Sequence, residues 1–503
     1  MSDPFGLGLR NRRTVPLGAV PVESVLGFRR TVVEAVGEGK RLVTLFGLPE
    51  DGDRVRLMAI LADDATALLG ATSAVVGERY PALAPDCSQA ARFERELAEQ
   101  CGVVPEGHPA LKPVRRHPPD QLPPRWARSP VDREAYGFGT IHGEEVHEVA
   151  VGPVHAGIIE PGHFRFQAHG EEVLSLEIML GYQHRGVERL LQGVDRTRAV
   201  LVAEAIAGDT VVGHADAHCG ALEALARCRK TPRAQAIRGV ALELERVANH
   251  LGDLGAIAGD VAYLQAAADF GALRGECLNL LMTLSGNRFG RGLLRPGGVL
   301  FDVDQTMAEE LMERLERLAE RAEPVARNFF SNASVQGRLE GVGIVPRARC
   351  REMGFVGVVA RACEMARDVR QDHPWGVFRF AHIPASTAWA GDVFARAYVR
   401  WLEVERSLPF LLEQAAGVPK GATMVPMGDL RPNELSVALV EGWRGEIAHA
   451  VVTDERGRIR RYKVTDPSFH NWDALVAAMP GNQISDFPLC NKSFNLSYAG
   501  HDL

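Results

Sequence analysis

Six prolines crowd into the short segment 113–130, and they constrain the fold of this 503-residue chain more than any other feature. Proline fixes φ and carries no backbone N–H, so a segment this rich in proline supports neither a helix interior nor a central strand. We therefore expect three parts: a first domain over residues 1–112, a linker over 113–140 and a large domain over 141–503. The prolines are Pro113, Pro118, Pro119, Pro123, Pro124 and Pro130.

The first part has the pattern of a small α+β domain. Residues 42–48 and 55–61 are rich in strand-forming side chains. They flank the segment 50–53, whose Asp-Gly-Asp sequence is typical of a β-hairpin turn. A helix is expected over 90–98.

In the large part, the spacing of the apolar residues changes from a strand period to a helix period. Segments between 146 and 178 alternate like strands. From Pro232 to Leu254 apolar side chains recur at i, i+3, i+4 and i+7, and Thr231 provides an N-cap. Further helices are expected at 262–285, 305–323 and 392–416, and a hairpin at 447–464. We therefore expect an α+β chain whose large, mainly helical domain carries peripheral antiparallel hairpins.

Composition and charge exclude several classes of function. The formal charge of −7 argues against general nucleic-acid binding. No apolar run reaches the roughly 18 residues of a membrane helix, and the N-terminus has no apolar signal core, so we expect a membrane to be reached only through partners, on its cytoplasmic face. The eight cysteines form no Cys-x-x-Cys pair, so neither a zinc site nor a disulfide framework is expected.

The large part contains a series of short glycine-rich and charged motifs, and their order along the chain is informative. They include Gly152-Pro153-Val154-His155, Glu160-Pro161-Gly162-His163, His184-Arg185-Gly186-Val187-Glu188, Asn249-His250-Leu251, Arg295-Pro296-Gly297-Gly298 and Arg444-Gly445-Glu446. In this order they resemble the large subunit of energy-converting, membrane-bound nickel–iron hydrogenases (the formate-hydrogenlyase type) and its relative, the 49 kDa subunit of respiratory complex I. In the first part, segments 93–96 and 106–109 are similar to the signature of the 30 kDa subunit of complex I, a docking module.

The resemblance implies a place in a membrane-bound oxidoreductase complex. The implied partners are an iron–sulfur small subunit like the 20 kDa subunit of complex I, a ferredoxin-like subunit, and antiporter-like and other integral membrane subunits. NAD(P)H and quinone are the implied donor and acceptor of such a complex. Because this chain has no dinucleotide-binding glycine motif, we expect NAD binding in another subunit. We expect no cofactor bound by the chain itself, an iron–sulfur cluster in the partner, and quinone as one candidate ligand.

A nickel–iron centre needs four thiolates from two Cys-x-x-Cys pairs, and the chain does not supply them. In the frame of the hydrogenase motif Arg-x-Cys-Gly-x-Cys-x-x-x-His, Ala207 and Thr210 stand at the cysteine positions. Near the C-terminus, where hydrogenases carry Asp-Pro-Cys-x-x-Cys, Cys490 stands alone. We therefore expect no metal site; ligation of another metal by histidine or aspartate is the less favoured alternative. The residues expected to line the vacated cavity are His155, Ala207, Gly208, Asp209, Thr210, His214 and Cys490.

The quinone site that the complex I branch implies is also incomplete. There a tyrosine and a histidine bond the quinone and an aspartate supports the histidine. The tyrosine position is Gly208 here, which has no proton to donate, whereas His163 lies near the histidine position and Asp260 matches the aspartate. His155 or His218 are alternatives for the missing donor.

The acidic residues that carry protons in the resembled family have better matches in this chain than its metal and quinone ligands do. Glu160 matches the glutamate that shuttles protons in the hydrogenase branch, and we expect a dry cavity to raise its pKa. Glu188 matches a second acidic position toward the membrane subunits. An equally weighted alternative is an ion pair between Glu188 and Arg185 or Arg189.

Arg444 matches the arginine that overhangs the hydrogenase metal, and it could hold a carboxylate or an anionic substrate, or pair with Glu446.

Three functions are compatible with these residues: an oxidoreductase subunit, which we favour; a non-catalytic scaffold; and an active hydrogenase, the least favoured. An open polar cavity favours chemistry, and a sealed apolar one favours the scaffold. The residues expected to carry the chemistry are Glu160, His163, Glu188, Asp260 and Arg444.

Overall fold

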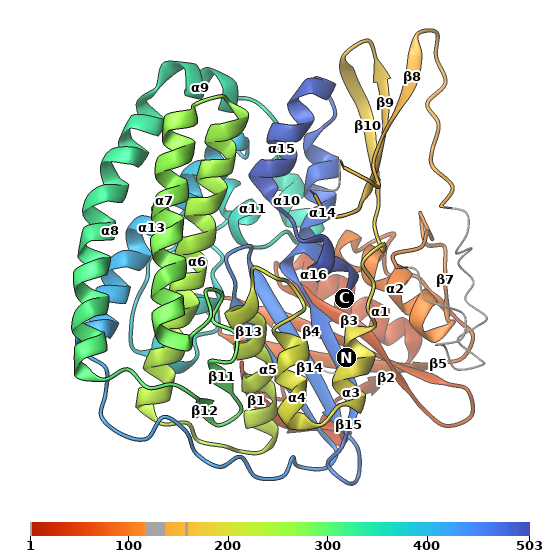
Figure 1. Ribbon diagram of the computed structural model, residues 1–503. Helices are drawn as coiled ribbons and strands as arrows, with labels where there is room; N and C mark the ends of the chain where they lie inside the picture. The colour runs from red at the N-terminus through yellow and green to blue at the C-terminus, as the bar shows by residue number, and fades with distance from the viewer. Residues whose placement is uncertain (1–2, 116–135, 156–158) are drawn as a thin grey trace.

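The structure is a computed structural model that describes residues 3–115, 136–155 and 159–503 (Figure 1). Most of the predicted linker, residues 116–135, lies outside the described residues. The strands are β1 (Arg13–Pro16), β2 (Val22–Glu23), β3 (Arg41–Pro49), β4 (Val55–Asp63), β5 (Leu68–Val76), β6 (Arg79–Pro81), β7 (Val104–Glu106), β8 (Val146–Val151), β9 (His163–His169), β10 (Glu172–Met179), β11 (Leu294–Arg295), β12 (Gly298–Val299), β13 (Glu434–Glu441), β14 (Glu446–Thr453) and β15 (Ile459–Thr465).

The helices comprise the long ones of the main layer, α6, α7, α8 and α13, and shorter ones around them. They are α1 (Val25–Gly37), α2 (Ala91–Cys101), α3 (Val187–Gly193), α4 (Arg196–Ala203), α5 (Val211–Leu225), α6 (Pro232–Asp260), α7 (Leu264–Ser285), α8 (Gln305–Ser331), α9 (Ala333–Leu339), α10 (Arg347–Met353), α11 (Gly357–Ala362), α12 (Val369–Asp372), α13 (Val393–Ala416), α14 (Pro467–Ala478), α15 (Phe487–Phe494) and α16 (Tyr498–Asp502). Short 3₁₀ turns are η1 (Leu17–Ala19), η2 (Ser88–Ala90), η5 (Gly376–Arg379) and η6 (Ile484–Asp486).

The first part is a four-stranded sheet in the order β2-β5-β4-β3 with α1 and α2 against it. The predicted hairpin is confirmed as β3 and β4, and the predicted helix as α2. β4 is buried along its whole length and β3 as far as Leu48, because each face meets a different core. Leu45 packs in one core with Phe93, and Phe46 packs in the other with the large part. The first part is therefore packed directly onto the rest of the chain.

A second sheet ties the chain's beginning to its end. Its order is β1-β13-β14-β15, and β1 pairs antiparallel with β13, with Val15 opposite Leu435. The hydroxyls of Thr44 on β3 and Thr465 on β15 are 3.0 Å apart and add a side-chain bond between the two sheets. The assignment of residues 1–112 to a 30 kDa-like docking domain stays a prediction.

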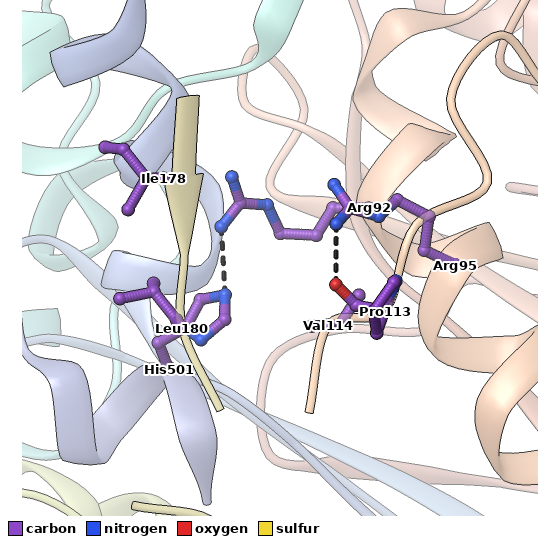
Figure 2. Close-up of a pocket in the computed structure, with 7 residues that line it drawn as sticks. All are labelled: Arg92, Arg95, Pro113, Val114, Ile178, Leu180 and His501. Carbon is purple, nitrogen blue, oxygen red and sulfur yellow. Dashed lines mark hydrogen bonds between the residues drawn. The ribbon is translucent and has the colours of Figure 1, made fainter. Parts of the chain in front are cut away.

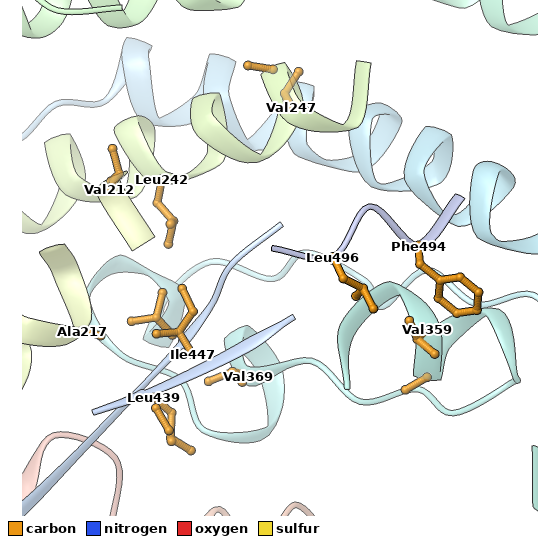
Figure 3. Packing of buried hydrophobic residues seen from close by; sticks show 14 of the residues in the cluster. Val212, Ala217, Leu242, Val247, Val359, Val369, Leu439, Ile447, Phe494 and Leu496 are labelled. Carbon is orange, nitrogen blue, oxygen red and sulfur yellow. The ribbon is translucent and has the colours of Figure 1, made fainter. Parts of the chain in front are cut away.

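The helical layer of the large part is formed by α6, α7, α8 and α13, which run side by side in Figure 1. The predicted helices are confirmed, and the Thr231 hydroxyl caps α6 by accepting from the N–H of Ala234 at 3.1 Å. Figure 3 shows Leu242 of α6 and Ile447 of β14 in the same buried core, while α5 is the helix that packs on β13 and β14. Among the helices built from the described residues, none is both long and apolar enough to cross a bilayer.

A cluster of buried ions fastens this layer to the sheet. Glu403 of α13 lies 2.7 Å from Arg361 of α11 and 3.1 Å from His250 of α6, and it also pairs with Arg246 of α6. All four side chains are fully or almost fully excluded from solvent. Arg361 extends the cluster to Glu441 of β13 at 2.8 Å. We call the set the Glu403 cluster; its members are Glu243, Arg246, His250, Arg361, Asp368, Arg370, Glu403 and Glu441.

Removing the central carboxylate should be costly. Glu403→Ala leaves two buried guanidinium groups without their shared partner, so we expect the free energy of unfolding to fall by about 3–5 kcal/mol. The exposed Glu405 on the same helix is the matched control, and Glu405→Ala is expected to change stability by no more than about 0.5 kcal/mol. Denaturant unfolding of both variants measures the difference, and equal losses would contradict a special role for Glu403.

Candidate functional site

The candidate site is built on one ion pair, between Arg444 and Asp209. Arg444 lies in the β13–β14 turn, and its two terminal nitrogens donate to the two carboxylate oxygens of Asp209 at 2.7 and 2.8 Å. Such a bidentate ion pair fixes the orientation of the guanidinium as well as its distance from the carboxylate. The carboxylate that Arg444 binds is therefore one of the chain's own, whereas Glu446 pairs with Arg41 at 2.8 Å.

Two glycines let the backbone hold Arg444 in place. Gly445 has a φ of +139° and Gly357 a φ of +64°, conformations that side chains rarely adopt. A Cβ on Gly357 would lie 2.1 Å from the carbonyl oxygen of Arg444. The turn that carries Arg444 is thus pressed against the start of α11, where only glycine fits.

Polar neighbours fix the other half of the pair. The backbone carbonyl of Asp209 accepts from Trp443 Nε1 at 3.0 Å and from Asn249 Nδ2 at 2.9 Å. The Thr210 hydroxyl donates to the Asp209 carboxylate at 3.1 Å. Asp209 keeps 35% of its side chain exposed, and a Cβ on Gly208 would meet no atom within 4 Å. The site is therefore polar, and it is open on the side of Gly208.

Glu245 of α6 adds a proton-binding group beside the pair. Its carboxyl oxygens accept from the N–H groups of Val212 and Gly213 at 2.6 and 3.0 Å, at the first turn of α5. Burial raises the pKa of Glu245 to about 8, and the negative charge of Asp209 acts in the same direction. The carboxyl can therefore take up and release a proton near neutrality.

The sequence analysis missed Glu245, although the pattern contained a signal for it. The residue lies four positions after Ala241 and three before Ala248, so it falls on the apolar stripe of the predicted helix. A carboxyl on a buried stripe requires partners or a shifted pKa. Asp253, eight residues further on, repeats the signal and is held by Arg400 at 2.6 Å.

The C-terminal segment that meets this site is 495–500, and it contains no cysteine. Arg444 Nε donates to the carbonyl of Asn495, and Arg185 links the carbonyls of Ala205 and Ala499 at 2.6 and 2.9 Å. Cys490 instead lies on α15, where a Cβ on Gly343 would come within 2.4 Å of its sulfur. Burial raises the pKa of the Cys490 thiol to about 11, so it is not a thiolate at neutral pH.

These residues do not fit a nickel–iron centre. Ala207 presents a buried methyl group, and the Thr210 hydroxyl is occupied by Asp209 and by Trp443 Nε1 at 3.1 Å. Within residues 3–115, 136–155 and 159–503, no group of three or more His, Cys, Asp or Glu side chains is arranged to hold a metal ion. His214 is fully buried and bonded at both ring nitrogens, to His449 and Asp466.

The two predicted histidines of the hairpin region bond backbone carbonyls of the same region. His163 opens β9 and bonds the carbonyl of Gly152 at 3.1 Å, and His155 bonds that of Gly162 at 2.9 Å. Glu160 is exposed, so the desolvation that its predicted role requires does not come from this chain's own residues.

Glu188 is held in a buried ion cluster rather than in a proton-carrying state. Lys463 lies 2.9 Å and Arg461 3.2 Å from its oxygens. Burial opposes its ionisation, but these positive charges outweigh burial and lower the pKa of Glu188 to about 2. Glu188 is therefore ion-paired, but with Lys463 and Arg461, whereas Arg185, one of its two predicted partners, donates to backbone carbonyls.

Asp260 ends α6 and bonds Lys492 of α15 at 2.6 Å. Its second oxygen is buried and has no hydrogen-bond partner in the described chain. The structure thus brings Gly208, Asp209, Thr210 and Arg444 together, with His214 one helical turn away.

A second region of interest is the seam between α2 and the chain's end, shown in Figure 2. Arg92 donates to Nε2 of His501 at 2.9 Å, and Arg95 donates to the carbonyl of Pro113 at 2.8 Å. The cavity between them measures about 10 Å³, room for about one water molecule. It is a packing seam and too small for a cofactor.

Glu245 should make stability depend on pH. Its pKa is about 8 in the folded chain and near 4.5 when unfolded, so the folded chain binds the extra proton and loses stability as pH rises between these values. We expect the unfolding free energy of the wild type to fall relative to that of Glu245→Gln by up to about 1.4 kcal/mol per pH unit in this window. Denaturant unfolding at several pH values tests this, and parallel pH profiles would contradict it.

Comparison with known proteins places this arrangement in a family. The protein family described as "Respiratory-chain NADH dehydrogenase, 49 Kd subunit" matches this chain over residues 260–434 and 423–502. The chain is 30% identical over 354 residues to the carbon monoxide-induced hydrogenase of Rhodospirillum rubrum, covering 69% of this chain and 97% of that protein. It is 27% identical to formate hydrogenlyase subunit 5 of Escherichia coli, covering 84% and 77%.

A third relative comes from the quinone-reducing branch. One of the NADH-quinone oxidoreductase subunits of Solibacter usitatus is 30% identical over 321 residues, covering 63% of this chain and 86% of that protein. The family match begins at residue 260, so the 30 kDa-like assignment of the first 112 residues is untested by it. The chain belongs to the family of the respiratory-chain NADH dehydrogenase 49 kDa subunit, in which its relatives include subunits of hydrogenases and of NADH-quinone oxidoreductases.

Proposed function

We propose that the chain is a subunit of a membrane-bound oxidoreductase of the complex I and energy-converting-hydrogenase type. Electrons arrive from an iron–sulfur cluster in a partner small subunit and pass to a quinone or to an acceptor of another chemical class, with coupled proton movement. The chain lies on the cytoplasmic face, attached through its ferredoxin-like, antiporter-like and other membrane partners. Any nicotinamide donor binds in another subunit.

The observation that carries the proposal is the Asp209–Arg444 pair beside Glu245. The pair stands where the hydrogenase frame has its first thiolate clamp, and Gly208 leaves one side of it open. A guanidinium in a fixed orientation stabilises negative charge on a reduced acceptor. Glu245, with a pKa of about 8, is a proton source of the right acidity at neutral pH. Together they support proton-coupled reduction of a polar headgroup.

A scaffold without chemistry is the second candidate, and a specific feature favours it. Each of the three side-chain nitrogens of Arg444 already donates within the chain, to Asp209, Thr210 or the carbonyl of Asn495. A ligand would have to displace one of these bonds. Active nickel-dependent hydrogenase chemistry is the least favoured, since segments 205–210 and 495–500 contain no thiol.

The first test is metal analysis of the native complex, purified from membranes through a tag on this chain. We expect iron in proportion to a partner's clusters and no nickel, because the chain lacks the four thiolates. Stoichiometric nickel would overturn the proposal in favour of a hydrogenase. A complex without iron would contradict an electron-carrying partner.

The second test replaces the guanidinium. In Arg444→Gln, electron transfer from a reduced dye to a quinone analogue should fall by roughly a hundredfold, because the acceptor's developing charge loses its fixed partner. Arg196, whose pair with Asp429 at 3.3 Å is exposed, is the matched control, and Arg196→Gln should keep full activity. Equal activity of both variants in intact complexes would favour the scaffold.

A further inference from the structure

Five buried side chains form an unbroken hydrogen-bonded chain behind the candidate site. They join two residues of α5, one residue each of β14 and β15, and the residue that caps α14. Each is at most 1% exposed. We call them the relay residues; in order they are Asp466, His214, His449, Tyr462 and His218.

The backbone explains why these side chains meet. His214 and His218 are one helical turn apart, so they point to the same side of α5. On the sheet, Val451 is the partner of Tyr462, which makes His449 its diagonal neighbour on the same face. Helix α5 packs on β13 and β14. The imidazole of His214 thereby meets His449 of β14, and that of His218 meets Tyr462 of β15.

The carboxylate end sets the direction of the first two bonds. Asp466 accepts from the N–H of Ser468 at 2.7 Å and lies 3.0 Å from Nε2 of His214. Burial opposes its ionisation, but the bond from His214 and the charges around it keep the pKa of Asp466 below its usual value. An ionised carboxylate only accepts, so Nε2 of His214 carries the proton.

The remaining directions follow if each ring carries a single proton, as the relay requires. Nδ1 of His214 then accepts, and Nε2 of His449, 3.1 Å away, donates. Burial holds the pKa of His449 far below its usual value, so this ring is neutral as well. Its Nδ1 therefore accepts from the Tyr462 hydroxyl at 2.8 Å.

The far end of the chain terminates in an unsatisfied acceptor. The Tyr462 oxygen accepts from Nδ1 of His218 at 2.8 Å, which leaves Nε2 of His218 without a proton. That nitrogen is buried and has no hydrogen-bond partner among the described residues. A buried imidazole nitrogen without a partner is costly, and its lone pair is the unused acceptor at this end of the chain.

We propose that the relay residues conduct a proton between Nε2 of His218 and the Asp466 carboxylate beside the Asp209–Arg444 pair. A proton that binds Nε2 of His218 releases the one on Nδ1 to the tyrosine oxygen. Each following group gains one proton and passes on another, so that one proton reaches Asp466 and each ring changes tautomer. No electron moves in this step, and Asp466, which becomes a neutral carboxylic acid, is the one relay residue whose net charge changes.

As a catalytic step the relay rests on the proposed function, but its pattern of protons does not. The first test is therefore independent of activity: ¹⁵N NMR of the full chain labelled at its 16 histidines, assigned with single His→Gln variants. We expect the Nε2–H form for His214 and His449, and the Nδ1–H form for His218. If His218 and His449 both took the Nε2–H form, the one Tyr462 hydroxyl proton could not bond both Nδ1 atoms, so the chain would be broken at Tyr462 and the proposal overturned.

The second test cuts the chain at its centre. Tyr462→Phe keeps the ring and removes the hydroxyl that joins two histidines, and Tyr263→Phe, on a half-buried tyrosine elsewhere, is the control. In the native complex, Tyr462→Phe should slow electron transfer by roughly a hundredfold and raise its solvent deuterium isotope effect, while the melting temperature verifies folding. Unchanged turnover in a folded, active complex would overturn the relay.

The two tests separate the two claims. If the wild-type complex transfers no electrons to any acceptor, the proposed function fails, and the NMR tautomers alone decide the relay. If the complex is active and the tautomers are as expected, the tyrosine variant decides whether protons use the path.

Discussion

The ion pairing of the buried Glu403 carboxylate is the interaction on which the rest of the large part depends. It lies at the meeting point of Arg246, His250 and Arg361, and so fixes α6, α11 and α13 relative to one another. Arg361 also pairs with Glu441 of β13, so the position of this strand is fixed relative to the same helices. An ion cluster excluded from solvent tolerates little displacement, because each unpaired charge would be left in a medium of low polarity.

The candidate site inherits its geometry from this cluster. Glu245 stands next to Arg246 on α6, so the position of the helix also sets where its carboxyl meets the first turn of α5. The same strand that holds Glu441 leads directly into the turn carrying Arg444. One buried cluster therefore positions both halves of the site: the proton-binding carboxyl and the guanidinium.

The absence of paired thiolates changes the chemistry available at this place in the fold. Soft sulfur ligands hold metals, whereas Asp209 and Arg444 hold each other and offer charge and hydrogen bonds to a ligand. The pair is also balanced in charge, which makes its partial burial tolerable without a bound ion. A family frame with an altered centre is thus physically stable as it stands.

Prediction from sequence succeeded where a local pattern carries the information. The helix from Pro232 and the hairpin around residues 50–53 were predicted from periodicity and turn residues. Helix α5 was not expected, because it is buried on nearly every side and so has no polar face to give a period. The pairing of β1 with β13 was also missed, since nothing local signals a partner more than 400 residues away.

The sequence by itself determined the family frame, the missing cysteines and the residue types at each motif position, because these are properties of order and spacing. The tertiary structure decided which charges meet. It assigned Asp209 to Arg444 and Lys463 to Glu188, and it packed Cys490 of α15 against Gly343. It also aligned His214 with His449 and Tyr462. Such partners come from distant segments, and burial fixes their protonation, so only the folded chain specifies them.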